Sequence, residues 1–549
     1  MADTRTKVDQ PPAPAAASGQ TLFARQSSGL VREISLGSAI AINVSFISIV
    51  YGIIGVTLVP LAFPGASLAG SVVICTVLCL PPYLMYSYFS RAMPRSGGDF
   101  VFVSRGLHPW VGLAASINGT LWYMFAITYA GFSTVQSALS GTLASVGTLS
   151  GNHTLVNWST DVLKHGWTLG LALVVIFLIY ACVCVRLHTT LAITRWMFYF
   201  VIAGTVLAAA VLLFSSRGDF ISGVHKAGGS YTGIIAASYK AGYTGHSHFS
   251  LGKTILASSV PFYALGFGIA TAYVGGEVRG GKDVATRGKF YSLLLGGAAM
   301  TIIYALAGSR IGYDFLGGST LLSTTASPAY TLGAPANLFF FVGLMSHSTV
   351  IAVLLGLAFL ASAIAVAIPA YLISSRALFA WSFDRFLPDS LSEVNERTRA
   401  PLRANTIATV VAVIMLIVVV FSSTSFAIAL SSTEILGLIL TFIVVSVAAI
   451  AFPYRRRSIY QGSPIERSIG GIPVITLVGV VSLGVYVLFA IAIAGTSGLA
   501  TVDGRTTNTG LYALILFVAI GIVAYPLIYL FNKRRGLDIS LASRELPPE

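Results

Sequence analysis

Charged side chains are scarce in this chain of 549 residues. Lys, Arg, Asp and Glu together make up 9% of it, whereas 55% of the residues are hydrophobic. Soluble domains carry about 25% charged residues, so the composition excludes an ordinary soluble globular protein. Apolar runs such as 171–181 and 407–421 recur along the chain, and about 20 apolar residues suffice to cross a bilayer as a helix. The sequence therefore predicts an all-α integral membrane protein in contact with the lipid bilayer.

The chain also lacks the residue clusters that metal sites, cofactor sites and many enzymes require. Its four cysteines, Cys75, Cys79, Cys182 and Cys184, lie in apolar runs with no further nitrogen or sulfur ligand nearby in the sequence. This favours buried small side chains over a metal site or a disulfide framework. No Walker-type phosphate loop and no intramembrane cluster of His, Asp and Glu is found. We therefore expect neither an enzyme nor an ATP-driven pump, and no metal or cofactor.

Twelve apolar runs are long enough to be membrane spans. They follow a polar, Ala- and Pro-rich segment at 1–29, which we expect to be a disordered cytoplasmic tail. The expected spans are 36–60, 67–90, 111–142, 166–186, 189–214, 254–277, 290–312, 337–381, 404–422, 427–452, 472–495 and 509–531. The eighth run is too long for one simple span, so its ends should include loop or interfacial helix. This division predicts a twelve-helix domain at 30–531 and a cytoplasmic C-terminal tail at 532–549.

The basic residues set the expected orientation, because Lys and Arg accumulate in cytoplasmic loops. When the N-terminus is placed inside, most of the 33 Lys and Arg residues fall in the two tails and the inner loops. Both termini are therefore expected in the cytoplasm, in a multi-pass protein of the plasma (cell) membrane. The net charge of +14 follows from this bias and requires no nucleic-acid partner.

Two of the apolar runs contain residues that interrupt helices. The run VPFYALGFGIA at 260–270 holds Pro261, Gly266 and Gly268, and the run AINVSFISIVYGIIG at 41–55 places hydroxyls and glycines among apolar residues. A broken helix exposes N–H groups on one half and carbonyls on the other, which suit a carboxylate and an ammonium or sodium ion. Gly and Ser also allow close helix packing in membranes. On these stretches alone, both interpretations stay open.

Three further stretches resemble signatures of the amino acid–polyamine–organocation (APC) superfamily of permeases. They are RAMPRSGGDFVFVSRGLHPWVG at 91–112, FYALGFGIATAYVGGEVRGGKDVATRG at 262–288 and SSRALFAWSFDRFLPDSLSEVNERTRAPLRAN at 374–405. The resemblance covers about residues 30–531. It implies two inverted five-helix repeats, at about 30–214 and 254–452, with discontinuous helices 1 and 6, plus two C-terminal helices at about 472–531. It also implies alternating access to a midplane site between the two broken helices.

The chain departs from this family at positions tied to ion coupling. Many members carry an acidic residue directly after the GF of span 6, where this sequence has Gly268. Some proton-coupled members carry a lysine in span 5, where Tyr199 stands near the expected position. Sodium-coupled relatives use hydroxyls of span 8, for which Ser362 is the mid-span candidate here. One hydroxyl does not assign sodium, so the coupling ion stays open between a proton and sodium.

The two breaks and the resemblance together predict a binding site. The substrate carboxylate is expected at N–H groups freed in span 1, and the substrate ammonium at carbonyls freed in span 6. The substrate-binding candidates are Ser45, Phe46, Ile47 and Ser48 in span 1, and Tyr263, Ala264, Leu265 and Gly266 in span 6. Phe267 and Trp122 are the candidate gates. Arg95 and Glu277 are expected to have a structural or gating role at the cytoplasmic end. Glu277 and Arg279 would form either a gate ion pair or a solvated surface pair.

The expected substrate follows from the distribution of charge. The sequence places Glu277, Arg310 and Glu434 near span ends. No span centre carries an acidic or basic residue. A charged substrate side chain would need a partner there. We therefore expect a secondary active transporter of amino acids that favours neutral ones. The alternatives are a permease for polyamines or other organic amines, which would require acidic residues in the cavity, and an amino acid sensor that does not transport.

Overall fold

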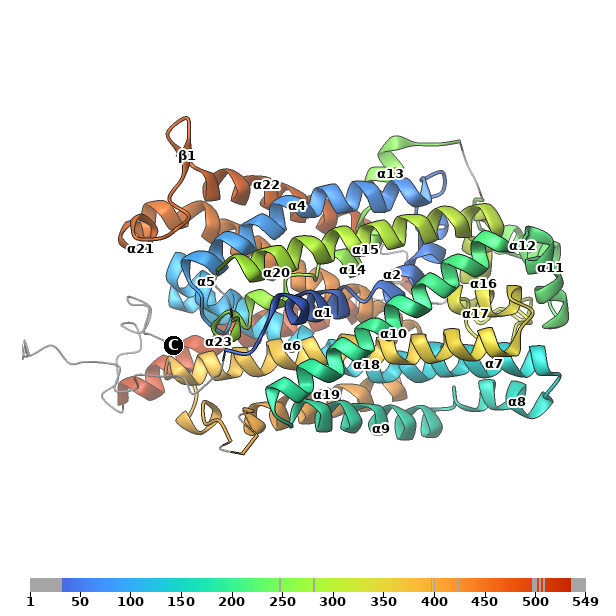
Figure 1. Cartoon of the computed structure of the whole chain (residues 1–549), viewed down its shortest axis with the longest axis horizontal. Helices are drawn as coiled ribbons and strands as arrows, with labels where there is room; N and C mark the ends of the chain where they lie inside the picture. The colour runs from blue at the N-terminus through green and yellow to red at the C-terminus, as the bar shows by residue number, and fades with distance from the viewer. Residues whose placement is uncertain are drawn as a thin grey trace, which may run out of the picture.

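The computed structural model describes residues 32–245, 248–279, 282–395, 397–398, 400–422, 424–495, 501–502, 505–506 and 509–534. Most of them lie in long helices that run side by side along one axis of the molecule (Figure 1). The strands of the described part form two short antiparallel hairpins: β1 (Ser468–Ile469) pairs with β2 (Ile472–Pro473), and β3 (Thr501–Val502) pairs with β4 (Arg505–Thr506). The core and the candidate site are therefore built from helices.

In the first half of the chain, some helices begin at a capping hydroxyl. Ser35 and Ser67 each accept a hydrogen bond from an N–H group of the first turn that follows, which satisfies a donor that has no partner within the helix. The elements are α1 (Leu36–Ile47), α2 (Ile49–Ile54), η1 (Gly55–Thr57), α3 (Leu58–Ala62), α4 (Leu68–Ala92), α5 (Asp99–Gly106), α6 (Pro109–Ser133), the π-helical η2 (Thr134–Leu139), α7 (Ser140–Ser150), α8 (His153–Asp161), α9 (His165–Val183), α10 (Leu187–Phe214), α11 (Arg217–Lys226) and α12 (Tyr231–Lys240).

The second half divides the expected eighth span. Asn337 caps one helix and Ser348 caps the next, so the run 337–381 forms a short helix and a long one. The elements are α13 (Leu251–Ala257), α14 (Ser259–Leu265), η3 (Ala270–Ala272), η4 (Gly275–Glu277), α15 (Lys282–Arg310), α16 (Tyr313–Thr324), α17 (Leu338–Met345), α18 (Thr349–Phe383), η5 (Asp389–Leu391), α19 (Leu402–Phe421), α20 (Thr424–Arg455), α21 (Arg457–Gln461), α22 (Val474–Gly495) and α23 (Thr509–Arg534).

Eleven stretches of the described residues are helical, long and apolar enough to cross a membrane. They are Leu36–Ala62, Leu68–Ala92, Pro109–Ser150, His165–Val183, Leu187–Phe214, Asp283–Arg310, Thr349–Phe383, Leu402–Phe421, Leu430–Arg455, Val474–Gly495 and Gly510–Arg534. Each overlaps one expected span. The expected span at 254–277 has no counterpart among them, because its helix stops at Leu265 and a turn occupies 266–269. The chain is therefore an all-α membrane protein with many spans.

Apolar side chains fill the interior and also cover the outside of the bundle. On the outside, Phe214 of α10 is 86% exposed, and Trp196 and Phe177 are also exposed, as suits contact with lipid. The turn at 266–269 is buried: Phe267 and Ile269 belong to the apolar core. Non-helical backbone at membrane depth is tolerated only where protein surrounds it or where it lines a polar cavity. The position of this turn therefore marks it as a candidate site.

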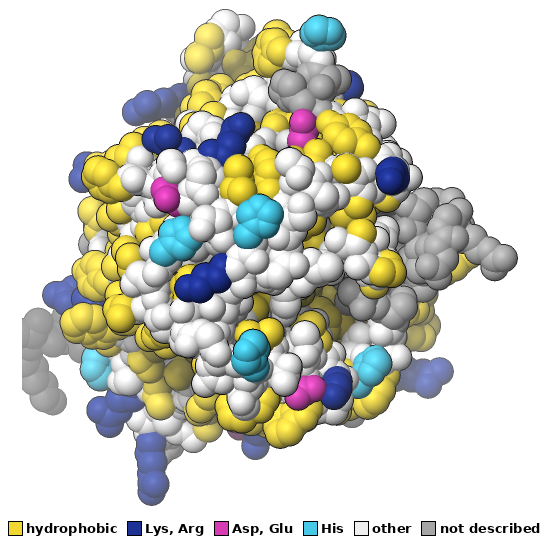
Figure 2. Space-filling model, turned by 90° about the vertical axis from the view of Figure 1, so that its right-hand side faces the viewer, with side chains coloured by type: hydrophobic (Ala, Val, Ile, Leu, Met, Phe, Trp, Pro, Cys, Tyr) yellow, Lys and Arg dark blue, Asp and Glu magenta, His cyan; other side chains and the backbone are white. Residues whose placement is uncertain are grey.

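The two ends of the bundle carry different elements. One end holds α5, α21 and the end of α23, and the other holds the shorter helices α8, α11, α12, α16 and α17 (Figure 1). We call them the inner end and the outer end, following the expected orientation. Figure 2 shows the outer end, where charged and histidine side chains lie scattered over the surface.

Candidate functional site

The helix of the first span is interrupted at Ser48. This residue has φ 47° and ψ 68° and separates α1 from α2. The left-handed conformation costs a non-glycine residue about 1–2 kcal/mol, and it ends the regular hydrogen-bond pattern of α1. The last carbonyls of α1 and the first N–H groups of α2 therefore lack the partners that a continuous helix would give them. The Ser48 hydroxyl lies 3.1 Å from the hydroxyl of Ser362 in α18.

The backbone of the sixth expected span is interrupted after Leu265. The carbonyl oxygens of Tyr263 and Gly266 accept no hydrogen bond from any residue that the structure describes. The Leu265 carbonyl, in contrast, accepts a 2.6 Å hydrogen bond from the Tyr83 hydroxyl of α4. The carbonyls of Tyr263 and Gly266 therefore have no described donor, whereas the carbonyl of Leu265 is occupied by Tyr83.

Packing explains the glycine that follows the GF of this span. A Cβ atom on Gly268 would lie 2.2 Å from the Tyr83 hydroxyl oxygen and 2.8 Å from Cδ1 of Ile47. No side chain fits there unless Tyr83 moves. The hydroxyl of Tyr83 thus occupies the space that a side chain at position 268 would need.

The two interruptions face each other across a buried contact. The side-chain oxygen of Asn43 accepts from the Thr271 N–H at 3.0 Å, and its amide donates to the Thr271 hydroxyl at 3.2 Å. The ring of Phe46 lies 5.7 Å from that of Phe267 and 5.8 Å from that of Tyr123, measured between centroids. Residues more than 200 positions apart in the sequence therefore form one aromatic-lined site.

Part of the predicted site lines a small pocket beside the first interruption. Ser45, Ser48 and Ser362 line it together with Val44, Phe198, Val201 and Ala365. The Ser45 hydroxyl is buried and bonds to no described residue. In α10 it is Phe198, and not the exposed Tyr199, that faces this pocket.

The remaining predicted binding residues of both spans are packed against neighbours. Ile47 and Leu265 are fully buried, and both lie beside Gly296 of α15. Ala264 packs against Gly52. A Cβ atom added to Gly52 would lie 2.7 Å from the Ala264 side chain. These residues shape the walls of the site.

The two candidate gates occupy different environments. Phe267 lies among the rings of Phe46, Phe262 and Phe442, between the two interruptions. Trp122 points elsewhere: its ring nitrogen donates to Asn118 at 3.2 Å, and its ring lies 4.7 Å from that of Phe517 in α23. The gating role expected for Trp122 therefore has no support in its position. The next residue, Tyr123, is the one that meets Phe46.

Two buried ion pairs lie at the inner end. Arg376 of α18 donates two hydrogen bonds of 2.8 Å to the Glu277 carboxylate, whose side chain is fully buried. The prediction that Glu277 pairs with Arg279 is therefore wrong, because its partner is Arg376. Arg105 of α5 lies 2.6 Å from the carboxylate of Asp384. Removing one partner of a buried pair costs about 3–5 kcal/mol, so these pairs hold the inner end together.

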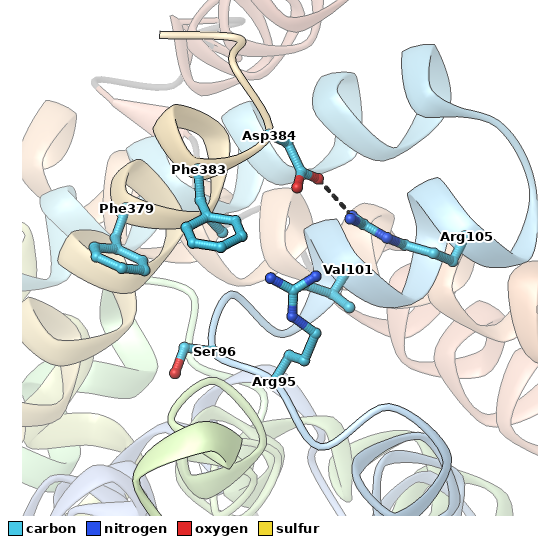
Figure 3. A pocket seen from close by; sticks show the side chains of 8 residues that line it. Arg95, Ser96, Val101, Arg105, Phe379, Phe383 and Asp384 are labelled. Atoms are coloured by element: carbon cyan, nitrogen blue, oxygen red, sulfur yellow. Dashed lines mark ion pairs between the residues drawn. The ribbon is translucent and has the colours of Figure 1, made fainter. Parts of the chain in front are cut away.

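Arg95 lines the same pocket as Arg105 and Asp384 (Figure 3). Its guanidinium lies over the ring of Phe383, 5.2 Å from the centroid. The pocket thus brings together side chains from two of the sequence signatures, 91–112 and 374–405. Sequence reasoning placed Arg95 at this end but did not find the Arg105–Asp384 pair.

Backbone hydrogen bonds add to the closure of the inner end. The N–H groups of Glu33 and Ile34 both donate to the Glu277 carbonyl at 3.0 Å, and Gly97 donates to the Tyr273 carbonyl at 2.9 Å. The segment before α1 and the loop before α5 are therefore joined to the chain that follows the second interruption. This contact separates the site from the inner surface.

A buried acid, Asp99, lies between the aromatic site and the inner end. Tyr86 donates a 2.8 Å hydrogen bond to one carboxylate oxygen, and Tyr273 donates to the other. The Tyr273 hydroxyl also lies 2.9 Å from that of Tyr123. Burial raises the pKa of Asp99 to about 6, although both hydrogen bonds oppose the shift. Sequence reasoning missed this residue, which belongs to the PRSGGDF part of the first signature.

Besides Arg376 of α18, the buried charged side chains inside the spans include Lys289 and Glu434, contrary to expectation. Lys289 of α15 is fully buried and donates to the Ser90 hydroxyl at 2.9 Å. Glu434 of α20 is 8% exposed. The sequence placed both near the starts of spans. Because α20 begins at Thr424, Glu434 lies about three turns inside it. The spans therefore do carry charge, although Lys289 and Glu434 both lie nearer the end of a span than its centre. The preference for neutral substrates stays a prediction.

A family model described as "Amino acid permease" matches residues 34–525. The match includes both interruptions, the buried acid and the ion pairs of the inner end. No curated protein matches the chain.

Proposed function

Because the chain belongs to the amino acid permease family, we propose that it is a secondary active transporter that moves amino acids by alternating access. The observation that carries this proposal is the pair of facing interruptions, at Ser48 and at 266–269. An amino acid carries a carboxylate and an ammonium group a few bonds apart. Helix ends with opposite partial charges, facing each other, suit such a zwitterion without charged side chains.

The substrate would lie between the two interruptions. Its carboxylate faces the backbone of 45–48, where the buried Ser45 hydroxyl has no described partner. Its ammonium faces the carbonyls of Tyr263 and Gly266, which accept no hydrogen bond from described residues. The Leu265 carbonyl takes no part, since Tyr83 occupies it. Phe46 and Phe267 cover the bound molecule, and Phe267 acts as a gate by a change of rotamer.

Alternating access requires that the inner end opens. In the structure, the Glu277–Arg376 and Arg105–Asp384 pairs and the backbone contacts of Glu277 close this end. We propose that they separate when the protein faces the cytoplasm. Each pair would then be exposed to water, so the desolvation of its charges is relieved as the attraction is lost. The states with the inner end closed and open can therefore have similar free energies and exchange.

The finer architecture belongs to the same proposal. Residues 254–277 would complete a twelfth span made of two half-helices, and the repeats at about 30–214 and 254–452 would be inverted copies. Interruptions in corresponding spans of two such repeats are the arrangement in which transporters bind substrates at the midplane. Both termini would lie in the cytoplasm, with the protein in the plasma membrane.

The coupling ion is either sodium or a proton. The Ser48–Ser362 contact of 3.1 Å brings together hydroxyls beside the first interruption, where free carbonyls suit sodium. The buried Asp99 has a pKa that burial raises to about 6, which suits a proton. The transport experiment separates them.

Purified protein in liposomes tests the proposed function. We expect uptake of at least one radiolabelled amino acid, with faster uptake when unlabelled amino acid is present inside. A sodium gradient or a pH gradient, imposed separately, identifies the coupling ion. Uptake of organic amines without any amino acid would favour the amine permease. Ligand-induced thermal stabilisation without flux would favour the sensor. Either result would contradict amino acid transport.

A further inference from the structure

We propose that Glu434 binds a second positive charge on the substrate, so that the transporter accepts cationic amino acids or diamines. The inference rests on the proposed function and specifies its substrate class. It starts from a buried carboxylate in α20 that the transport cycle, as described above, does not use.

The side chain of Glu434 is largely buried and pairs with no residue that the structure describes. The residue is 8% exposed, and no hydrogen bond or ion pair joins it to any residue that the structure describes. The described ion pairs of the inner end use other acids, Glu277 and Asp384. A buried carboxylate without a partner is costly, so a functional cycle should supply it with a cation or a proton.

Its surroundings connect it to the proposed binding site. One turn after Glu434, the Gly437 carbonyl of α20 accepts a 2.7 Å hydrogen bond from the Asn118 amide of α6, and Gly437 packs against the ring of Trp122. This face of α20 therefore lies against α6, which carries Tyr123 and Tyr129. The charge of Glu434 acts on the hydroxyls of Tyr123, Tyr129 and Tyr263, and Ser431 and Ser432 of α20 lie beside the hydroxyls of Tyr129 and Tyr263. Tyr263 supplies one of the free carbonyls, and Tyr123 contacts Phe46. The carboxylate therefore lies beside the site and not in a separate part of the bundle.

The groups around the carboxylate suit an ammonium ion. The three tyrosines and two serines are uncharged, so none of them neutralises Glu434. Aromatic rings attract cations, and hydroxyls can accept hydrogen bonds from an ammonium group. Two basic side chains that are buried in the spans bind elsewhere. Lys289 is bonded to Ser90 and to the Tyr86 carbonyl in α4, and Arg376 pairs with Glu277. None of these residues therefore competes with a substrate amino group for Glu434.

The balance of charge indicates that this amino group is a second one. The interruptions offer opposite partial charges to the α-carboxylate and α-ammonium, so they match a zwitterion of zero net charge. Glu434 adds one negative charge to this arrangement. A second ammonium group on the substrate can pair with Glu434, whereas a neutral amino acid leaves this carboxylate unpaired.

L-Lysine and L-norleucine form a matched pair of probes, because they share the four-carbon side chain and differ by the terminal ammonium group. Equilibrium binding to the purified, full-length protein gives the affinity ratio of lysine to norleucine. We expect wild type to prefer lysine, and we expect Glu434→Gln to reduce this ratio at least tenfold. Glu434→Asp, which keeps the charge, should retain most of it. The control is Glu393→Gln, which removes an exposed carboxylate paired with Arg403 and should leave the ratio unchanged.

The outcomes separate this inference from the proposed function. An equal loss of affinity for both probes in Glu434→Gln would overturn the inference, because Glu434 would then serve the α-ammonium or the fold. Loss of gradient-driven uptake with an unchanged affinity ratio would also overturn it, in favour of a proton site. If the wild-type protein bound norleucine but neither lysine nor 1,5-diaminopentane, the inference about Glu434 would be overturned, and the proposal of amino acid transport would stand. A wild type that binds no amino acid would instead contradict the proposed function.

Discussion

Substitution of Gly268 by alanine tests how the second interruption is held open. The added Cβ would lie 2.2 Å from the Tyr83 hydroxyl oxygen, far inside normal contact. Tyr83 must then move, and its 2.6 Å hydrogen bond to the Leu265 carbonyl is lost or lengthened. Overpacking of a core costs about 1–3 kcal/mol, and a buried hydrogen bond contributes about 1 kcal/mol. We therefore expect Gly268→Ala to lower the free energy of unfolding by about 2–4 kcal/mol.

The cause of that loss can be isolated in a double-mutant cycle with Tyr83→Phe. The phenylalanine removes the hydroxyl oxygen that a Cβ at 268 would strike, and the next nearest atoms are Cδ1 of Ile47 at 2.8 Å and Cζ of Tyr83 at 3.0 Å. Tyr83→Phe alone should cost about 1–2 kcal/mol, since the Leu265 carbonyl loses its donor. In the phenylalanine background, the penalty of Gly268→Ala should fall by about half.

Unfolding in detergent by heat and by denaturant, followed for the four proteins of the cycle, measures these differences. Strict additivity of the two substitutions would refute the reasoning, because it would mean that the hydroxyl and the new methyl group do not compete for space. Wild-type stability of Gly268→Ala would refute it more simply. Gly268→Asp, which adds a larger and charged side chain at the same place, should be worse than alanine.

Three further substitutions probe the inner end and the coupling pocket. Glu277→Gln leaves Arg376 buried without a carboxylate and should cost about 3–5 kcal/mol, measured by thermal unfolding; a change below about 1 kcal/mol would show that the pair contributes little. Because the pKa of Asp99 is raised from 3.8 to about 6, its contribution to stability is present below about pH 4 and is lost as pH rises through about 6. Asp99→Asn should therefore remove about 3 kcal/mol of pH dependence across that window, and an unchanged pH profile would contradict the assignment. Ser362→Ala should cost about 1 kcal/mol and abolish any sodium dependence of ligand-induced stabilisation, whereas retained dependence would remove Ser362 as a sodium ligand.

Hydropathy predicts most of the membrane-spanning helices, because length and apolar content decide whether a segment can cross a bilayer. It identified eleven runs that form long helices. The run at 254–277 is apolar too, but hydropathy does not report whether the backbone stays helical. Pro261, Gly266 and Gly268 indicated the interruption there. The separate helix at Leu338–Met345 followed from the excess length of the eighth run.

The binding site was predictable at the level of segments and less so at the level of side chains. Helix-breaking residues predicted interruptions near Ser48 and Gly266, since breaking propensity is local. The partner of Glu277 was not predictable, because Arg279 is close in sequence whereas Arg376 is close only after folding. The burial of Glu434 was hidden for a similar reason: its distance from the membrane surface depends on where α20 begins.

Uptake by Gly266→Leu tests most directly whether substrate binds at the second interruption. A Cβ at this position would lie 2.5 Å from the Phe262 ring, so a bulky side chain must project into the turn and crowd its free carbonyls. Gly484→Leu in α22 is the matched control, because a Cβ there has no neighbour within 4 Å among the described residues. In liposomes that contain equal amounts of inserted, monodisperse protein, the account predicts no amino acid uptake by Gly266→Leu and wild-type uptake by Gly484→Leu. Wild-type uptake by Gly266→Leu would contradict it.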